Sequence, residues 1–518
     1  MTVATRIAPS PTGDPHVGTA YIGLFNYAFA KSRRGRFIFR LEDTDRQRYD
    51  AKAEARILEM FEWLAIRPDE GPEIGGGHGP YRQSERTEIY RQHVESLLDA
   101  GKAYRAFETA EELEAMRTEQ KRLGRPLGYD GRGRDVPRSE QEERARAGEP
   151  HVVRLQTPDE GSTTFHDELR GDVSIDNAEI RDPVLLKSDG YPTYHLANVV
   201  DDHLMGVTHV IRAEEWVTST PIHVLLYLAF GWEAPRFVHM PLLRNPDKSK
   251  VSKRKLDTSV ASYRDQGILP EALLNFLATM GWSMPDGREF FTLDEMIAAF
   301  DIGRVSLGGP VFDLKKLRYY NAKYLRDQLS LEEVARRVAP LLEERGHTWD
   351  DHDYLLDVVD VLRPRAETLV DIADAAGYFF TEDVRYDASA RKQLAAGQKY
   401  LEDLEREFSI LEFFDYDGVD DLLHDYVQAQ SVGMGKVLQP LRAALTGTTS
   451  APGVTDLVTI LGKRRVLARI GKALAAINQG LPDDNPQREA EQEKQAAKLR
   501  QKGDAKAQAA GSKRGSLG

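Results

Sequence analysis

Two short segments of the chain carry side chains suited to binding a phosphate compound. The first is Pro9–Thr19, which reads PSPTGDPHVGT and places His16 and Gly18 at the start of an expected helix. Backbone N–H groups at a helix N-terminus attract phosphate oxygens, His16 can donate to a phosphate, and Gly18 leaves room for a purine or ribose. The alternative is that His16 only closes the turn after Pro15. This segment alone leaves both interpretations open.

The second segment is the cationic loop Lys250–Lys255, which reads KVSKRK and holds four cations in six residues. Such a run is typical of a solvated surface loop. This one follows an expected helix at Pro221–Phe230 and an expected strand at Phe237–Leu243, where an α/β protein assembles its site. Mobile ammonium groups there could follow the charge that develops on transferring phosphates. Taken alone, the loop favours the solvated interpretation.

The elements that must position these segments begin with a strand, a turn and a helix. Val3–Ala8 is expected as a strand, and the three prolines that follow cannot continue it because proline lacks an N–H donor. Apolar residues spaced by three and one over 17–29 predict an amphipathic helix. Alternating apolar residues over 37–41 predict a second strand that ends at Glu42 and Asp43. This β-α-β start predicts a parallel sheet, whose ligands lie beyond the carboxyl ends of its strands.

The rest of the chain changes character twice. Residues 109–150 are rich in Glu, Arg and Gly and predict part of an inserted subdomain with a solvated surface, before strands at His151–Gln156 and Pro183–Lys187. After about residue 325 the pattern is helical, with a capping box at Ser330–Glu333. From Gln487 onward eight Lys or Arg stand against four Asp or Glu, which predicts a mobile basic tail.

Composition narrows the class of protein. The 518 residues suggest three to four domains, and the absence of cysteine excludes disulfides, thiolate nucleophiles and Cys-ligated zinc. The longest nearly apolar stretch, Val224–Trp232, is about half of what a membrane span needs, and the N-terminus shows no signal pattern. The net charge of -13 counts only weakly against a nucleic-acid partner, because a phosphate backbone meets one face of a protein. A large cytosolic globular protein is expected.

Taken together, the two segments resemble the paired signatures of class I aminoacyl-tRNA synthetases. His16–Thr19 is similar to their HIGH motif and Lys250–Arg254 to their KMSKS loop, and about 235 residues separate the two. Further stretches occur in the order found in the bacterial glutamyl type: Arg6–Gly13, Arg40–Asp45, Tyr191–Asp202 and Arg212–Trp216. The resemblance runs from the first residues to about residue 480.

The resemblance implies an α/β Rossmann-type class I catalytic domain with an inserted α+β acceptor-binding subdomain, followed by all-α anticodon-binding domains. The implied parts are the catalytic domain at 1–75 and 191–255, the insertion at 76–190, a stem-contact domain at 256–325, helical anticodon-binding domains at 326–485, and the basic tail at 486–518.

The implied reaction joins L-glutamate to ATP, releases diphosphate, and moves glutamate from the adenylate to the 3′-terminal adenosine of tRNA(Glu). Glutamate activation is expected to require bound tRNA. Mg²⁺ is expected to come with ATP. Some relatives hold zinc by cysteines near Tyr104–Phe107 and Tyr129–Gly133; those cysteines are absent here, so no zinc is predicted. The family also implies a cytoplasmic monomer without a membrane partner.

The resemblance assigns two sets of site residues. Glutamate is assigned to Arg6, Ala8, Ser10, Glu42, Tyr194, Asn198 and Arg212. ATP is assigned to His16, Gly18, Thr19, Glu215, Trp216, Leu243, Lys250 and Lys253, of which His16, Lys250 and Lys253 are the expected catalytic residues. The chemistry agrees, since a planar guanidinium grips both oxygens of a carboxylate and Glu42 is a natural counter-ion for an ammonium group. The alternatives are that Arg212 pairs with Glu214 and that Tyr194 belongs to the core.

For tRNA, the expected phosphate contacts are Arg132, Arg134 and Arg138, and the expected anticodon contacts are Arg365 and Arg442. A solvated charge run is an equal alternative for the first three. In the family, an arginine at the position of Arg365 goes with rejection of glutamine tRNA, so an enzyme specific for tRNA(Glu) is favoured over a non-discriminating one.

Three other classes fit the sequence less well. The glutamyl-queuosine type lacks anticodon domains, and the small adenylate-forming nucleotidyltransferases are much shorter. A catalytically silent tRNA-binding protein would have damaged motifs, whereas His16, Lys253, Arg6 and Glu42 are intact.

Overall fold

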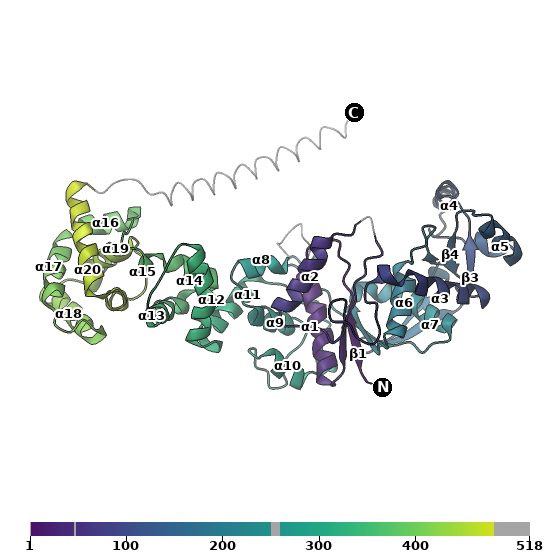
Figure 1. Cartoon of the computed structure of the whole chain (residues 1–518), viewed down its shortest axis with the longest axis horizontal. Helices are drawn as coiled ribbons and strands as arrows, with labels where there is room; N and C mark the ends of the chain where they lie inside the picture. The colour runs from purple at the N-terminus through teal and green to yellow at the C-terminus, as the bar shows by residue number, and fades with distance from the viewer. Residues whose placement is uncertain (1, 46–47, 250–258, 481–518) are drawn as a thin grey trace, which may run out of the picture. The chain divides into compact units, whose positions relative to one another are not determined.

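The computed structural model describes residues 2–45, 48–249 and 259–480. The chain divides into two compact units, residues 1–324 and 325–518 (Figure 1). Lys250 and Lys253 of the cationic loop and the expected basic tail lie outside the described residues. Within the described part, no helix combines the length and apolar character that crossing a membrane requires.

The first unit opens with the predicted β-α-β motif. Strand β1 (Ala4–Ile7) pairs in parallel with β2 (Arg36–Phe39), in a register that joins Ala4 to Arg36 and Ile7 to Phe39. Between them runs α1 (Val17–Ser32), and every apolar position that predicted this helix is buried. The predicted parallel sheet is therefore confirmed, and every residue of its two strands except Arg36 is buried, as is typical of a parallel sheet.

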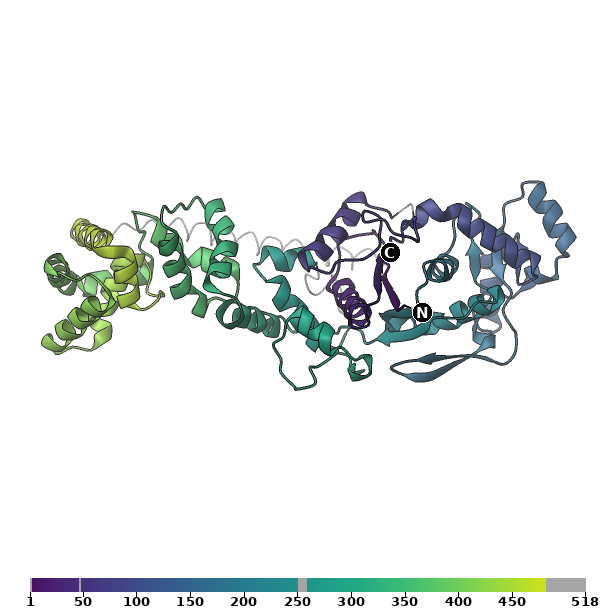
Figure 2. The ribbon, with the colours of Figure 1, turned by 60° about the horizontal axis from the view of Figure 1, so that its bottom comes forward.

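A second group of strands continues this layer. Strands β8 (His209–Ala213) and β9 (Arg236–Met240) are parallel to each other and belong to a sheet with the order β6-β5-β9-β8. The backbone amide of Thr208 donates to Ala4 and so ties β8 to β1. Strands β5 (Ser162–Asp167) and β6 (Gly171–Asp176) form an antiparallel hairpin (Figure 2). The carboxyl ends of the parallel strands thus meet at one edge.

The unit contains further helices outside the insertion. They are α2 (Ala51–Trp63), α6 (Tyr194–Leu204), α7 (Thr220–Phe230), α8 (Val260–Asp265), α9 (Pro270–Thr279), α10 (Leu293–Ala299) and α11 (Leu314–Lys323), with the 3-10 turns η4 (Glu214–Ser219) and η5 (Ile302–Arg304). One apolar core joins α1 and β2 to residues of α9, α10 and α11. Helix α1 is therefore packed into the core along most of its length, and this packing fixes the position of its first turn.

The insertion forms its own small antiparallel sheet, β3 (Ala103–Ala106), β4 (Val152–Leu155) and β7 (Val184–Leu186). Its helices and turns are η1 (Gln83–Arg86), α3 (Thr87–Asp99), α4 (Ala110–Arg122), η2 (Arg132–Asp135), α5 (Arg138–Arg146) and η3 (Asn177–Glu179). The expected solvated stretch at 109–150 contains α4 and α5, which sequence periodicity did not predict. Both helices are largely exposed, so their sequences lack an apolar stripe.

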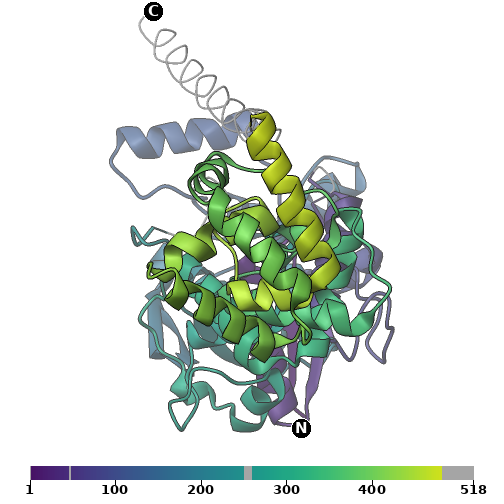
Figure 3. The same cartoon turned by 90° about the vertical axis from the view of Figure 1, so that its left-hand side faces the viewer.

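The regular elements of the second unit are all helices within its described residues (Figure 3). After η6 (Tyr324–Gln328) come α12 (Leu331–Glu344), α13 (His352–Leu362), η7 (Arg363–Arg365), α14 (Leu369–Ala375), α15 (Gly377–Phe380), α16 (Ala388–Ala396), α17 (Gln398–Ile410), α18 (Tyr416–Ala429), α19 (Met434–Thr446) and α20 (Val454–Gln479). Ser330 caps α12 as predicted by accepting from the Glu333 amide, whereas the Glu333 carboxylate binds Arg336 and Arg337.

Candidate active site

A cavity of about 410 Å³ lies at the carboxyl ends of β1, β2, β8 and β9. Its walls come from the end of β1, the first turns of α1, residue 42 after β2, α6, the end of β8 with η4, and residues 241–243 after β9. This is where a parallel sheet is expected to bind its ligand.

The structure brings most of the predicted site residues into this cavity. Those that line it are Arg6, Ala8, His16, Gly18, Thr19, Glu42, Tyr194, Asn198, Arg212, Glu215, Trp216 and Leu243. Ser10 is exposed and is not among the lining residues, because the proline-rich turn carries it away from the cavity. Lys250 and Lys253 fall outside the described residues.

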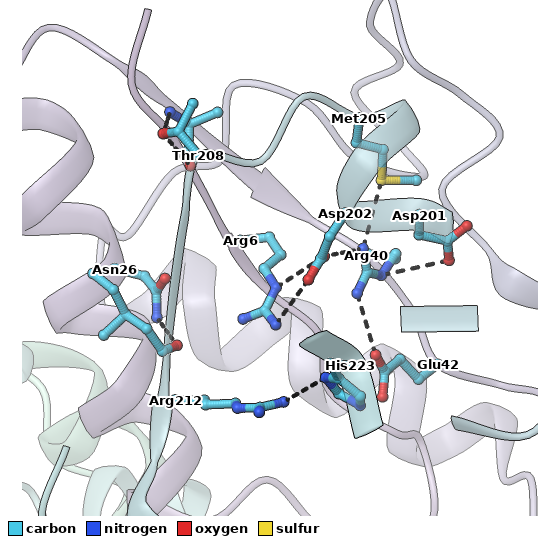
Figure 4. A network of polar contacts seen from close by, with 12 residues as sticks. Arg6, Asn26, Arg40, Glu42, Asp201, Asp202, Met205, Thr208, Arg212 and His223 are labelled. Atoms are coloured by element: carbon cyan, nitrogen blue, oxygen red, sulfur yellow. Dashed lines mark hydrogen bonds and ion pairs between the residues drawn. The ribbon is translucent and has the colours of Figure 1, made fainter. Parts of the chain in front are cut away.

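One side of the cavity is a buried network of opposite charges (Figure 4). The Arg6 guanidinium donates to both carboxylate oxygens of Asp202, at 3.1 and 3.3 Å. Arg40, which is fully buried, donates to the same carboxylate at 2.7 Å and lies 3.7 Å from Asp201. Burial alone would raise the pKa of Asp202, but the two guanidinium groups outweigh it and hold that pKa below its ordinary value. Both cations on this side therefore have a carboxylate partner.

Two of the residues predicted to bind glutamate border that network. Asn198, in the amide orientation that satisfies both of its ends, donates to Asp202 at 3.2 Å and accepts from Arg40 at 3.0 Å. Glu42 lies 3.4 Å from Arg40. Burial raises the pKa of Glu42 above its ordinary value, while Arg40 and Arg6 oppose that rise. A further cation beside Glu42 would therefore stabilise its charged form.

The opposite side of the cavity is built around Arg212, which is 5% exposed. Its guanidinium reaches only neutral acceptors, namely the Tyr194 hydroxyl at 3.0 Å, Thr220 Oγ1 at 2.8 Å, the Trp216 carbonyl at 3.5 Å, His239 Nε2 at 3.1 Å and His223 Nδ1 at 3.3 Å. No ion pair to Arg212 is found among the residues that the structure describes, and the alternative partner Glu214 binds Arg170 instead. A buried cation without a counter-ion attracts an anion.

The His16 ring lies at the start of α1 and at the cavity wall. Its Nδ1 accepts from the Gly18 amide at 3.0 Å, so the ring caps α1 while it also lines the cavity. A Cβ at position 18 would lie 3.2 Å from His16 Nδ1, so Gly18 makes room for this ring. The backbone of His16 forms an antiparallel bridge with Ser259, the first described residue after the cationic loop. The start of α1 therefore lies beside the segment that leads into α8.

Aromatic residues form the wall beside Arg212. The rings of Tyr194 and Trp216 are 4.5 Å apart between centroids and tilted by 34°. Trp216 is partly exposed. Tyr194 accepts from Arg212 through its hydroxyl, so it is a wall residue with a polar end and not only a core residue.

Sequence reasoning gave no role to Asp202, Arg40, His223 or His239. For Asp202 a signal was available, because Tyr194, Asn198 and Asp202 are spaced by four and must share one face of α6. His239 is paired with Arg212 across β8 and β9, and only a strand register of this kind reveals such a partner.

The arginines predicted to contact tRNA in the insertion all form ion pairs there. Arg132 binds Asp130, Arg134 binds Asp182 and Asp159, and Arg138 binds Asp99 and Glu142. The side chain of Arg134 is only 18% exposed. A structural role is therefore the better interpretation of Arg134.

Near the expected cysteine positions of zinc-holding relatives, the insertion has a small core of Tyr104, Ala106, Met116 and Tyr129. Among residues 2–45, 48–249 and 259–480, no cluster of three or more acidic or histidine side chains has the arrangement of a metal site. The absence of zinc stays a prediction.

In the second unit, Arg365 and Arg442 donate to neighbouring carbonyl oxygens, those of Ala451 at 2.6 Å and Pro452 at 3.3 Å. A hollow of about 970 Å³ is lined by Arg365, Tyr378 and Ala451 among others. Burial, and then Arg365, lowers the pKa of Arg442. The two arginines predicted for anticodon recognition thus both contact the loop between α19 and α20.

Comparisons with known proteins place both units. Residues 2–319 match the family described as the class I tRNA synthetases for E and Q, catalytic domain, and residues 333–474 match an anticodon-binding domain. The chain is 59% identical to a glutamate–tRNA ligase of Thermus thermophilus over 91% of this chain and 100% of that protein, and 52% identical to that of Deinococcus radiodurans over 90% and 98%. A crystal structure of the glutamate–tRNA ligase of Elizabethkingia meningosepticum in complex with its amino acid superposes with a TM-score of 0.85 at 36% identity, covering 92% of this chain and all of that one.

Proposed function

Because the chain belongs to the glutamate–tRNA ligases, which are class I aminoacyl-tRNA synthetases, we propose that its 410 Å³ cavity is where L-glutamate and ATP react to form glutamyl-adenylate. Glutamate is then transferred to the 3′-terminal adenosine of tRNA(Glu). The reaction releases diphosphate in the first step and AMP in the second.

Arg212 is the observation that carries this proposal. Its buried guanidinium has no carboxylate partner among the described residues, so a ligand carboxylate supplies the missing counter-charge. The α-carboxylate of glutamate must remain free to attack the α-phosphorus of ATP, and Arg212 is therefore better suited to the side-chain carboxylate. Glu42 and Ala8 line the same cavity, and the Glu42 carboxylate with the Ala8 backbone suits the ammonium group.

No protein nucleophile is needed for this chemistry. An oxygen of the glutamate α-carboxylate forms the new bond to the α-phosphorus while the bond to diphosphate breaks, and the chain contributes position and charge. We assign the phosphates to His16, Gly18 and Thr19, and the ribose and base to Glu215, Trp216 and Leu243. Lys250 and Lys253 are assigned to the departing diphosphate on the strength of the motif alone. Mg²⁺ enters with ATP.

The second unit is proposed to bind the tRNA anticodon through Arg365 and Arg442. The match of residues 333–474 to an anticodon-binding domain supports this role. A guanidinium can read the edge of the last anticodon base, and the comparisons do not favour the non-discriminating alternative. We further propose the division into catalytic, insertion, stem-contact and anticodon domains at the boundaries given above, a monomeric state, and a cytoplasmic location with other translation enzymes.

Exchange of labelled diphosphate into ATP in the presence of glutamate tests the function. It is measured without tRNA, with tRNA(Glu) and with tRNA(Gln). We expect exchange only with tRNA(Glu). Equal exchange with both tRNAs would support the non-discriminating enzyme, and strong exchange without tRNA would contradict the proposed coupling between the two units.

Lys253→Ala tests the role of the cationic loop. We expect a strong loss of adenylate formation with nearly unchanged tRNA affinity, because the proposed partner of Lys253 is diphosphate and not tRNA. A loss of tRNA binding equal to the loss of activity would contradict that role.

A further inference from the structure

We propose that His239, held by Asp167, is a positioning residue that aims the Arg212 guanidinium into the cavity without neutralising it. This inference rests on the proposed function, because it concerns how Arg212 is kept ready for a glutamate carboxylate. It assigns a role in substrate binding to two residues that lie outside the cavity wall.

Three neighbouring strands place these groups in a row. Strand β9 lies between β5 and β8, and Arg212 on β8 is the register partner of His239 on β9. Asp167 ends β5 and pairs with Phe237 of β9. Asp167 and His239 are fully buried. Because the row runs across a sheet and not along a loop, its geometry is rigid.

Asp167 selects the tautomer of His239. One carboxylate oxygen, Oδ2, lies 2.6 Å from His239 Nδ1 and 3.0 Å from the His239 backbone amide, which donates to it. The other oxygen accepts from the amides of Leu169 and Arg170, each at 3.0 Å. Since an ionised carboxylate only accepts, Nδ1 must carry the proton.

Arg212 requires the same tautomer. Its Nε lies 3.1 Å from His239 Nε2, and a guanidinium only donates, so Nε2 must offer a lone pair. Burial lowers the pKa of His239; the hydrogen bond that Nδ1 donates to Asp167 opposes this shift, and the charge of Arg212 adds to it. One neutral tautomer therefore satisfies both neighbours.

The neutral ring explains why Arg212 stays without a counter-ion. A carboxylate in the place of His239 would fix the direction of Arg212 equally well, but it would cancel the charge that the ligand must meet. The imidazole ring stands between the Asp167 carboxylate and the Arg212 guanidinium, so the negative charge does not contact Arg212. Arg212 is also held by Thr220 and, as Figure 4 shows, by His223, which are neutral as well. The arrangement thus separates orientation from charge compensation.

Two amide variants of His239 test its hydrogen bonds to Arg212 and to Asp167 separately. In His239→Gln the amide oxygen can stand near the position of Nε2 and accept from Arg212, whereas in His239→Asn the amide can keep only the hydrogen bond to Asp167. The KM values for glutamate and for ATP are measured by tRNA-dependent diphosphate exchange. We expect the KM for glutamate to rise about ten-fold or more in His239→Asn and to stay within about three-fold in His239→Gln.

The KM for ATP is expected to stay within about two-fold in both variants, because neither contacts the ATP wall. Asp167→Asn is a second test, since an amide nitrogen facing Nδ1 forces the other tautomer and turns an N–H toward Arg212; the same selective rise is expected. Affinity for tRNA(Glu) and the melting temperature report whether each variant is folded. If a His239 variant does not fold, Asp167→Asn provides the test, and the His239 variants provide it if Asp167→Asn does not fold.

His166→Gln is the matched control. His166 lies next to Asp167 on β5 and forms a similar contact with Asp172 at 2.7 Å, but it is exposed and faces away from the cavity. Its substitution is expected to change neither KM. Equal effects of His239→Asn and His239→Gln on glutamate, or a rise shared by glutamate and ATP, would overturn the positioning role. If the wild-type chain shows no glutamate-dependent exchange, the proposed function fails; with an active wild type, the variants test the inference alone.

Discussion

The two sides of the cavity treat buried arginines in opposite ways. On one side Arg6 and Arg40 share Asp202 within hydrogen-bond distance. On the other side Arg212 is surrounded by hydroxyl, carbonyl and imidazole acceptors. All three guanidinium groups are buried. The same residue type is therefore charge-matched on one side of the cavity, and on the other side it keeps the charge that we propose a ligand carboxylate meets.

Burying Arg212 without a counter-ion costs free energy, and this cost falls only on one side of the cavity. A buried charge without a partner is unfavourable, and a protein retains it only where something else gains from it. The paired side contributes a rigid wall, because Asp202 holds both guanidinium groups and Arg40 also lies close to Asp201 and Glu42. On the proposed function, bound glutamate supplies the counter-charge that the unpaired side lacks and gains affinity from it.

The largest expected effect is the loss of glutamate binding in Arg212→Gln. We expect kcat/KM for glutamate to fall about a thousand-fold, since the variant removes the charge that meets a ligand carboxylate. The melting temperature is expected to change little, because the acceptors around residue 212 are neutral. Exchange kinetics and thermal unfolding of the same preparation measure both quantities. A large drop in melting temperature with little kinetic change would reverse the comparison.

Asp202→Asn is expected to act on stability first. It leaves Arg6 and Arg40 buried without their shared carboxylate, and such a loss costs about 3 kcal/mol in the free energy of unfolding. Denaturant unfolding of the full chain measures this free energy, with a signal that reports on the first unit. Asp172→Asn on the exposed hairpin is the control and should be nearly neutral. If both variants unfold alike, the network around Asp202 does not stabilise the fold.

Glu42→Gln is expected to raise the KM for glutamate about ten-fold, because the ammonium group loses its counter-ion. The effect depends on pH. Burial raises the pKa of Glu42, so the group becomes neutral at a higher pH than an exposed carboxyl. The wild-type KM should therefore rise as pH falls through that pKa, while the KM of Glu42→Gln stays level over the same range. Parallel pH profiles of the two proteins would show that Glu42 does not bind the ammonium group.

The smallest expected effect is that of Arg6→Lys. The variant keeps the charge beside Asp202 but loses one of the two hydrogen bonds, which costs about 1 kcal/mol of stability. Urea unfolding measures it, and kcat/KM for glutamate should fall only a few-fold. A loss as large as that of Arg212→Gln would place Arg6 on the ligand-binding side of the comparison.

Much of the fold follows from apolar spacing. The parallel pair β1–β2, helix α1 and the helical second unit were predicted because each buries one clear apolar pattern. Helices α4 and α5 were not, because they are exposed and their sequences lack an apolar stripe. The resemblance to a known family predicted the lining of the cavity well, and Ser10 is the described residue that lies elsewhere. The contact of Arg212 with His239 could not be predicted from the sequence, since it depends on the register of two strands.

The pair Arg6–Asp202 also bears on how the chain is made. Its two residues are 196 positions apart, and the hydrogen bond between Ala4 and Thr208 spans 204. At roughly 5–20 residues per second, about 10–40 s of synthesis separate Arg6 from Asp202. For most of that interval both Arg6 and Arg40 have been translated and their shared carboxylate has not, because Arg40 precedes Asp202 by 162 positions. The paired wall is thus a late product of synthesis, and it closes only after the whole insertion has left the ribosome.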